Sequence, residues 1–226
     1  MIPYCRPARQ ALGALSLMAM ALPAAHAGDS PWSLRVGPAH VGFDAKSTVE
    51  VGGAPVPGGF IEVEDNTALA FEVGYRATDR WTLRLAFGVP PTSTLSTGGT
   101  LNTLVPPLTG TLGKVKYGPA VLSATWNLGD FGAFRPYVGA GINYTHVFKT
   151  TDGDIGGLRI KSAWGSALQA GFDVAIDRDW SLFVDARKVF VKTTATGTVP
   201  ALGGPPAKAN VTLDPLIVHI GAAYRF

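Results

Sequence analysis

The chain has 226 residues, of which 46% are hydrophobic and 15% are charged, a charged share well below that of an ordinary soluble domain. It carries 19 basic and 16 acidic residues, a balance too even to indicate nucleic acid, and we expect no such partner. The single cysteine, Cys5, lies in the N-terminal segment, so the remainder can form neither a disulfide nor a cysteine-ligated metal site.

The N-terminal segment has the order of a secretory signal peptide. Arg6 and Arg9 precede an apolar run at residues 11–25, and Ala25, His26 and Ala27 supply a small-residue cleavage site. We expect residues 1–27 to be a cleaved signal peptide and residues 28–226 to form one domain. The alternative is a membrane anchor, for which the apolar run is short. The remainder has no apolar run of roughly 18 residues, which excludes spanning helices there.

Apolar and polar residues alternate through most of the remaining chain, as they do in a β-strand with one apolar face. The alternation predicts eight strands, in chain order at residues 31–43, 67–78, 80–89, 118–128, 134–148, 158–174, 180–190 and 219–226. In the first strand the phase slips near Gly37 and Pro38, which predicts a β-bulge. Most of these segments reach the roughly 10 residues that a tilted membrane strand requires.

The connections between these strands alternate in length. Three are short turns, ATDR, GDFGA and IDRD, whereas the others are long and rich in Gly, Pro and Thr, at residues 44–66, 90–115, 149–157 and 193–209. Short turns at one end and long links at the other are typical of outer-membrane proteins. The sequence therefore predicts an all-β fold, an eight-stranded antiparallel transmembrane β-barrel with short periplasmic turns and long extracellular loops. The alternative is a β-sandwich.

Aromatic residues favour the membrane barrel over the sandwich. At the short-turn end each strand places an aromatic side chain on its apolar face, which gives a girdle of Trp32, Tyr75, Trp81, Trp126, Phe134, Phe172, Trp180, Tyr224 and Phe226. A second ring begins at the other end with Phe87, Tyr144, Trp164 and Phe190. Rings of aromatic residues at matched strand ends are expected at lipid–water interfaces. The last strand alternates up to Phe226, and such an end resembles the signal that presents outer-membrane proteins to their assembly machinery.

The sequence resembles the OmpW family in four blocks: YGPAVLSATWNLGD, FRPYVGAGINYT, SAWGSALQAGFDVAIDRDW and LDPLIVHIGAAYRF. The resemblance implies an integral barrel of the Gram-negative outer membrane, exported through the periplasm. It also implies passive passage of small hydrophobic molecules through a narrow apolar tunnel with a lateral opening in the wall. The expected partners are outer-membrane lipids, lipopolysaccharide and small hydrophobic solutes.

Charged residues alternate with the lipid-facing ones and are therefore predicted to lie inside the barrel. An eight-stranded barrel is only wide enough for its own side chains, so ion pairs across the lumen would form a polar plug. The plug is predicted to comprise Glu72, Arg84, Asp173, Asp185, Arg187, His219 and Arg225. Basic residues outnumber acidic ones on these faces, an excess that could instead attract anions.

The long links carry apolar residues, which are unusual in exposed loops and indicate binding. Phe60, Leu101 and Leu104 are predicted to line a ligand pocket formed by the extracellular loops. Prolines at strand ends, among them Pro90 and Pro119, remove ladder donors and could leave a lateral gap, or could merely end the strands.

Two other functional classes stay open at this point. A lipid-modifying outer-membrane enzyme would need a nucleophile and a base, but no G-x-S-x-G motif is present and no catalytic grouping is recognisable. We therefore expect no catalysis, no cofactor and no metal. A non-transporting structural or adhesion barrel is the other alternative.

Overall fold

The computed structural model describes residues 30–103, 108 and 110–226, so the predicted signal peptide, residues 1–27, and Leu104 lie outside the described residues. The described chain is antiparallel β-structure with two short 3-10 helices, η1 (Thr100–Thr103) and η2 (Pro200–Leu202). None of the helices in this part of the chain is long and apolar enough to cross a bilayer.

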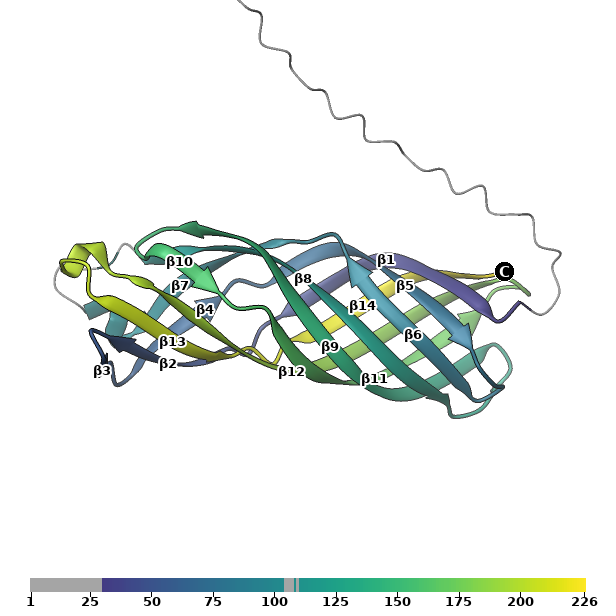
Figure 1. Ribbon diagram of the computed structural model, residues 1–226. Helices are drawn as coiled ribbons and strands as arrows, with labels where there is room; N and C mark the ends of the chain where they lie inside the picture. Colours follow the sequence, from purple (N-terminus) through teal and green to yellow (C-terminus); the bar gives the residue numbers. More distant parts are fainter. Residues whose placement is uncertain (1–29, 104–107, 109) are drawn as a thin grey trace, which may run out of the picture.

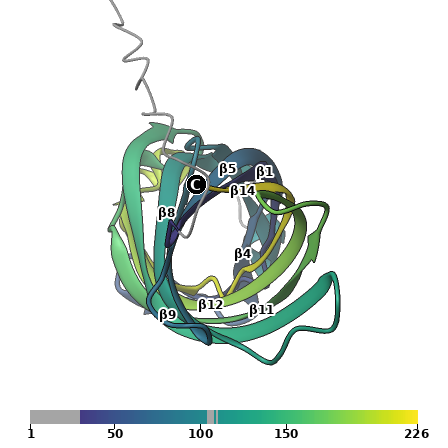
Figure 2. The same ribbon diagram turned by 90° about the vertical axis from the view of Figure 1, so that its right-hand side faces the viewer.

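Eight strands close into a barrel, as predicted. They are β1 (Trp32–Gly42), β5 (Asn66–Arg76), β6 (Trp81–Gly88), β8 (Thr111–Asn127), β9 (Phe134–Asp152), β11 (Ala163–Ala175), β12 (Trp180–Thr198) and β14 (Leu216–Arg225). Each pairs with the next in this order, and β14 returns to pair with β1, which closes the ring seen end-on in Figure 2. The closed ring leaves no unpaired edge in this part of the sheet.

Short turns join the strands at one end of the barrel. In the turn between β11 and β12, the Asp177 carboxylate accepts hydrogen bonds from the backbone N–H groups of Asp179 and Trp180, at 2.9 and 2.7 Å. These two bonds stabilise the ionised form and hold the pKa of the Asp177 carboxyl below its ordinary value. The side chain thereby satisfies backbone donors that the tight turn leaves without a strand partner.

The outer face of the barrel is apolar where a soluble protein would be polar. Large exposed side chains there include Leu69, Leu83, Leu85, Leu122, Ile142, Leu168, Leu182 and Ile220. Near the short turns, aromatic rings of neighbouring strands lie in pairs: Trp32–Tyr75, Trp81–Trp126, Phe134–Phe172 and Trp180–Tyr224, with ring centroids 4.9, 4.8, 5.1 and 5.0 Å apart. An apolar band edged by aromatic rings is the surface that a bilayer core covers.

The long links join the barrel strands at the end opposite the short turns, as predicted, and much of their length is itself β-structure. They continue the wall as β2 (Lys46–Val51), β3 (Ala54–Pro55), β4 (Gly59–Val63), β7 (Thr92–Gly99), β10 (Gly156–Ile160) and β13 (Pro206–Thr212), at the left of Figure 1. β7 pairs with β4 and β8, and β13 pairs with β12 and β2. Between β2 and β4 the Ile61 N–H donates to the Ser47 hydroxyl at 2.8 Å. Val and Thr favour extended structure, and the many Gly and Pro residues mask this in the sequence.

The predicted bulge near Gly37 and Pro38 is absent, because β1 pairs with β5 in unbroken register from Trp32 to Val41. Odd-numbered residues of β1 from Arg35 onward are buried throughout, so the strand never changes face. What changes is the polarity on each side. Arg35 lies in a polar interior, whereas Ala39 and Val41 lie in an apolar one. The apparent slip in phase thus marks a change of environment rather than of backbone geometry.

Barrel closure depends on a close approach between β1 and β14. A Cβ atom on Gly37 would overlap the Ile220 carbonyl oxygen, so the two backbones fit together only because this residue has no side chain. We predict that Gly37→Ala lowers the folded fraction, since one strand must shift at a cost of roughly 1–3 kcal/mol. Heat-modifiable mobility on gels measures that fraction. Gly42→Ala on the same strand is the control, because its Cβ would meet nothing closer than 3.7 Å. Equal folded fractions for the two variants would contradict this account of closure.

Candidate functional site

The half of the barrel interior nearer the short turns contains a buried cluster of charged side chains centred on Glu72. The Glu72 side chain is 0% exposed. Its carboxylate is ion-paired with Arg35 of β1 at 3.2 Å, with Arg84 of β6 at 3.0 Å, and with Arg187 of β12. Strand alternation turns each of these side chains inward from a different part of the wall. Guanidinium groups from three other strands therefore surround one carboxylate inside the barrel.

Two further acids complete the charge balance of this cluster. Asp173 accepts from Arg35 at 2.6 Å, and Asp185 lies 2.9 Å from the guanidinium of Arg187. Asp185 also accepts hydrogen bonds from Tyr137 at 2.8 Å and from Gln169 at 2.6 Å. The three arginines and three carboxylates have no net formal charge. Pairing of this kind is required because a buried charge without a partner is strongly destabilising.

Aromatic rings fill the space around the guanidinium groups. The Tyr137 ring centroid lies 4.6 Å from Arg84 and 5.1 Å from Arg35, and the Phe183 ring lies 4.9 Å from Arg35. The His219 ring, buried beside the cluster, packs against Phe183 at 4.7 Å. An eight-stranded barrel has little room beyond such side chains. The cluster therefore forms a floor across the barrel, here called the charged floor.

The structure brings together most of the residues of the predicted plug. Glu72, Arg84, Asp173, Asp185 and Arg187 form the charged floor, and His219 adjoins it. Arg225 is the exception, because its guanidinium donates to the Arg178 carbonyl at the rim of the barrel.

Sequence reasoning left Arg35, Tyr137 and Gln169 out of the plug. Alternation places them inside the barrel. However, it does not reveal that Arg35 bridges two acids that lie 37 and 138 residues away in the chain. The excess of basic residues expected inside is also absent from the charged floor. Arg135, for example, lies at the rim, 3.6 Å from Asp130.

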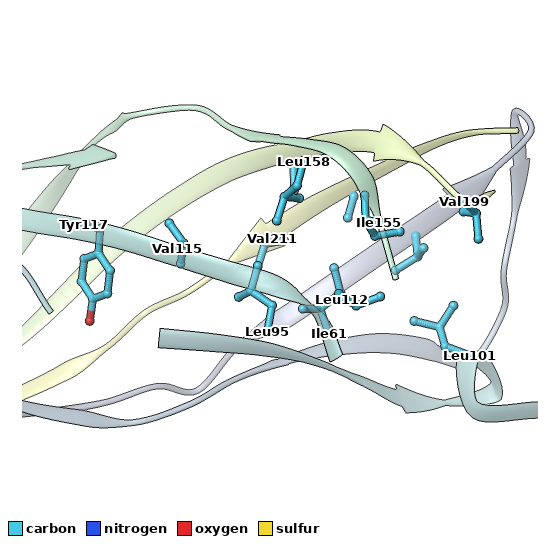
Figure 3. Close-up of a cluster of buried hydrophobic side chains, with 13 residues drawn as sticks. Ile61, Leu95, Leu101, Leu112, Val115, Tyr117, Ile155, Leu158, Val199 and Val211 are labelled. Carbon is cyan, nitrogen blue, oxygen red and sulfur yellow. The ribbon is translucent and has the colours of Figure 1, made fainter. Parts of the chain in front are cut away.

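Beyond the charged floor the interior becomes apolar. A pocket with about 850 Å³ of space between its walls, some of it continuous with solvent, lies in this half of the barrel. Its wall contains four polar residues, Asn143, Thr145, Lys161 and Thr193. The other lining residues are apolar: Val41, Phe43, Ile61, Val63, Leu95, Val115, Tyr117, Pro119, Val147, Ile160, Ala163, Val189, Val191, Ala195, Val211, Leu213, Pro215 and Ile217. Figure 3 shows several of these side chains pointing from different strands toward a common space.

A second apolar cavity continues the pocket toward the end of the barrel opposite the short turns. It has about 560 Å³ of space and shares Ile61, Leu95 and Ala195 with the first pocket. Leu101 of η1 and Leu108 lie in its wall. The second cavity is lined mainly by the long links, whereas most residues of the main pocket belong to the barrel strands, such as Val41, Asn143 and Val189. Sequence reasoning looked for the pocket only in the loops, and it therefore missed the residues that the barrel strands contribute.

The three residues predicted for the ligand pocket have different positions. Leu101 is 2% exposed and lies in the apolar interior. Phe60 is 40% exposed, and its ring lies against Gly98 and Gly99 on the outside of the wall. Because successive residues of β4 point to opposite faces, the inward residue is its neighbour Ile61. Phe60 is therefore excluded from the pocket, and Leu104 lies outside the described residues.

The wall beside the pocket has an interrupted hydrogen-bond ladder. Pairing of β6 with β8 stops at Phe87 and Ala120, and pairing of β7 with β8 resumes at Thr92 and Lys116. Three prolines lie in this interval, Pro90 and Pro91 on one side and Pro119 on the other, and none has an N–H to donate.

A shallow cavity with about 520 Å³ of space between its walls, part of it continuous with solvent, lies at this interruption. It is lined by lipid-facing residues such as Leu69 and Val89 and by interior ones such as Val41 and Ile217. Val41, Tyr117, Pro119 and Ile217 also line the main pocket, whereas Arg187 and His219 of the floor region line only this one. The apolar interior thus meets the outer face of the barrel directly above the charged floor.

Within the described chain, no group of three His, Cys, Asp or Glu side chains is placed to hold a metal ion. On the outer face, the Ser162 hydroxyl lies 3.5 Å from a ring nitrogen of His146 and accepts a hydrogen bond from the Val147 N–H.

Comparison with known proteins identifies relatives along nearly the whole chain. The sequence model of the OmpW family matches residues 29–226. The chain is 40% identical over 198 residues to the dibenzothiophene metabolism operon protein PahQ of Pseudomonas aeruginosa, covering 88% of this chain and 90% of that protein. It is 31% identical over 178 residues to the outer membrane protein AlkL of Ectopseudomonas oleovorans, covering 79% and 74%. The crystal structure of the outer membrane protein OprG from Pseudomonas aeruginosa matches with a TM-score of 0.79 at 27% identity, over 86% of this chain and 95% of that chain.

We predict that Arg84→Leu lowers the free energy of unfolding by roughly 3–5 kcal/mol, because it leaves Glu72 with one fewer buried partner. Denaturant unfolding of the barrel in lipid vesicles measures this change. Arg225→Leu is the matched control. Its side chain contacts a backbone carbonyl at the rim, so its effect should stay within about 1 kcal/mol. Unfolding midpoints for Arg84→Leu equal to those of the unsubstituted protein would contradict the charged floor.

Proposed function

The chain belongs to the OmpW family, and we propose that it passes small hydrophobic molecules passively from the cell exterior into the outer membrane. Its relatives AlkL and OprG are outer membrane proteins, and the closed barrel carries an exposed apolar band. The protein is therefore an integral outer-membrane barrel. The observation that supports transport is an apolar pocket that meets a second apolar space at the wall interruption, next to the charged floor.

The charged floor sets the direction of the proposed route. An apolar molecule in the pocket gains free energy at roughly 25 cal/mol for each Å² of its surface removed from water. To move farther along the axis, the solute would have to separate the ion pairs of Glu72. Leaving a buried charge without its partner costs several kcal/mol. The floor therefore opposes axial passage into the periplasm, and a solute must leave the pocket by another way.

The wall interruption beside Pro90, Pro91 and Pro119 supports a lateral exit. Strands there are not joined by a continuous ladder, so widening the interval breaks few hydrogen bonds. The cavity at this place is lined on its outer side by Leu69, Phe87 and Val89. Those side chains belong to the lipid-facing surface. A hydrophobic solute that moves through the interval passes from one apolar environment to another.

The solutes we propose are planar aromatic molecules without charge. The relative PahQ is named for a dibenzothiophene metabolism operon, and a fused aromatic ring system of that kind has no hydrogen-bond donor. The apolar pocket offers mostly aliphatic side chains, which suit such a molecule. Passive movement requires neither a cofactor nor a catalytic group, and we propose that the protein is not an enzyme.

The proposed partners follow from the two ends of the barrel. Outer-membrane lipids cover the apolar band, with lipopolysaccharide around the end that carries the long links. The assembly machinery is proposed to receive the C-terminal strand, where the Phe226 N–H donates to the Trp32 carbonyl at 3.1 Å next to the closing pair of β1 and β14. A barrel that served only as an anchor would have no need for a connected apolar interior.

We predict that the double substitution Ile61→Ser and Leu95→Ser slows uptake of dibenzothiophene, because the shared wall of both cavities becomes polar. Each lost side chain contributes on the order of 1–3 kcal/mol to holding an apolar molecule, so the expected reduction is at least about tenfold. Uptake into vesicles containing the purified protein measures it by fluorescence.

Phe60→Ser provides the matched control for this uptake experiment. Phe60 is the chain neighbour of Ile61 but points away from the pocket, so this variant should transport normally. Equal uptake rates for the unsubstituted protein, Ile61→Ser/Leu95→Ser and Phe60→Ser would contradict the proposal that the solute passes through the pocket. Vesicles with the unsubstituted protein that took up no more solute than empty vesicles would contradict transport itself.

A further inference from the structure

Basic side chains gather on the outside of the barrel wall beyond the second aromatic ring. Six of them are called here the basic belt: Lys114 and Lys116 of β8, Lys149 of β9, Arg159 of β10, Lys161 directly after β10, and Lys192 of β12. All six are exposed. The chain neighbours Val115, Leu158 and Val191 are buried in the apolar interior, so Lys114, Lys116, Arg159 and Lys192 lie on the opposite, outer face of the wall. Lys161 lies between the two faces, because it lines both the main pocket and a groove on the outer surface.

The basic belt lacks internal compensation. Within residues 30–103, 108 and 110–226, none of the six side chains forms a hydrogen bond or an ion pair. Lys116 and Lys149 are direct cross-strand partners of β8 and β9, and like charges in such positions destabilise a sheet. The buried arginines of the charged floor, by contrast, are all paired with acids. An arrangement that costs stability and lacks internal partners indicates an anionic ligand.

Aromatic residues next to the basic belt indicate its depth in the membrane. Tyr144 and Trp164 form a ring pair with centroids 4.7 Å apart, and His146 and Phe148 form another at 4.7 Å. Lys149 directly follows Phe148, and Lys161 precedes Trp164 by three residues. Aromatic rings of membrane proteins lie at the headgroup level. The basic belt therefore begins where acyl chains end and phosphate groups start.

A groove on the outer surface separates two residues of the basic belt. It has about 780 Å³ of space, open to solvent, and its wall contains Lys161 and Lys192 together with Ser162, Thr194, Asn210 and Trp164. The ammonium, hydroxyl and amide groups can all donate hydrogen bonds to phosphate oxygens. The Trp164 ring offers an apolar surface on the membrane side of the same groove.

We propose that the basic belt binds the lipid-borne phosphate groups of a phosphorylated glycolipid in the outer leaflet, with one phosphate in the groove between Lys161 and Lys192. The phosphates neutralise the unpaired charges, and the acyl chains of the same molecule cover the apolar band below. A single molecule of this kind would therefore contact both the basic belt and the apolar band. The groove shares Lys161, Ala163, Thr193 and Val211 with the wall of the main pocket, but binding at the basic belt can be measured without transport through the interior.

The test measures binding of lipid A to the purified barrel in neutral detergent, with the phosphorylated and the dephosphorylated lipid compared. The variant Lys116→Gln/Lys149→Gln should bind phosphorylated lipid A on the order of tenfold more weakly, since each cation near a phosphate surface contributes on that scale. The control variant Arg80→Gln/Arg178→Gln removes two exposed cations at the short-turn end and should bind normally. Dephosphorylated lipid A lacks the phosphates, so it should bind the unsubstituted protein and Lys116→Gln/Lys149→Gln with equal affinity.

A further variant separates charge from folding. Lys116→Glu places an acid opposite Lys149, which should preserve the unfolding midpoint while reducing binding of phosphorylated lipid A. Inorganic phosphate at millimolar concentration should not displace the lipid. Unchanged binding by Lys116→Gln/Lys149→Gln or by Lys116→Glu would overturn the proposal. So would equal binding of the two lipids, or displacement by free phosphate.

Discussion

The ion pairs of Glu72 with Arg35, Arg84 and Arg187 are the interaction on which the rest of the molecule depends. They tie four strands together across the barrel axis and, with Asp173 and Asp185, leave no net charge buried. Without them the narrow interior would contain charges that can face neither lipid nor water. With them it has a floor. The apolar side chains above can then form a pocket that is closed below rather than a water-filled channel through the membrane.

The polarity of the inner and outer faces of the wall is reversed on the two sides of the charged floor. On the short-turn side lipid covers apolar residues and the interior is charged, whereas on the other side the interior is apolar and the outer face carries lysines and threonines. The ladder between β6–β7 and β8 is interrupted between these two regions. From the short-turn end, the charged floor is followed by the wall interruption and then by the apolar pocket, with the basic belt on the outer face of the wall around that pocket. This order suits a route that begins outside the cell and ends in the hydrocarbon of the membrane.

The sequence was sufficient to predict the eight strands, the three short turns and the family, because strong alternation against lipid is visible without coordinates. Prediction from the sequence failed where apolar and polar residues do not alternate clearly. The strands within the Gly- and Thr-rich links were not predicted, and the change of environment along β1 resembled a bulge at Gly37. Choosing Phe60 instead of Ile61 was a difference of one residue, which in a strand exchanges the outer face for the inner one. The bridging by Arg35 depends on contacts between distant strands that no local pattern encodes.

The lateral exit is tested most directly by a reversible cross-link across the wall interruption. A Cβ atom at position 118 would lie 2.9 Å from Phe148 Cε2 and 3.5 Å from Pro90 Cγ. The Phe148 ring must therefore shift slightly, and a cysteine at 118 then faces position 90, where Pro90→Cys/Gly118→Cys is designed to form a disulfide. The only native cysteine, Cys5, lies in the predicted signal peptide. Leu85→Cys/Leu122→Cys joins paired residues of the intact ladder and is the control. Oxidation should sharply reduce uptake of dibenzothiophene through the first protein, reduction should restore it, and the control should be indifferent to both. Equal uptake by the oxidised and reduced forms of Pro90→Cys/Gly118→Cys, with the disulfide verified by mass, would contradict exit through this part of the wall.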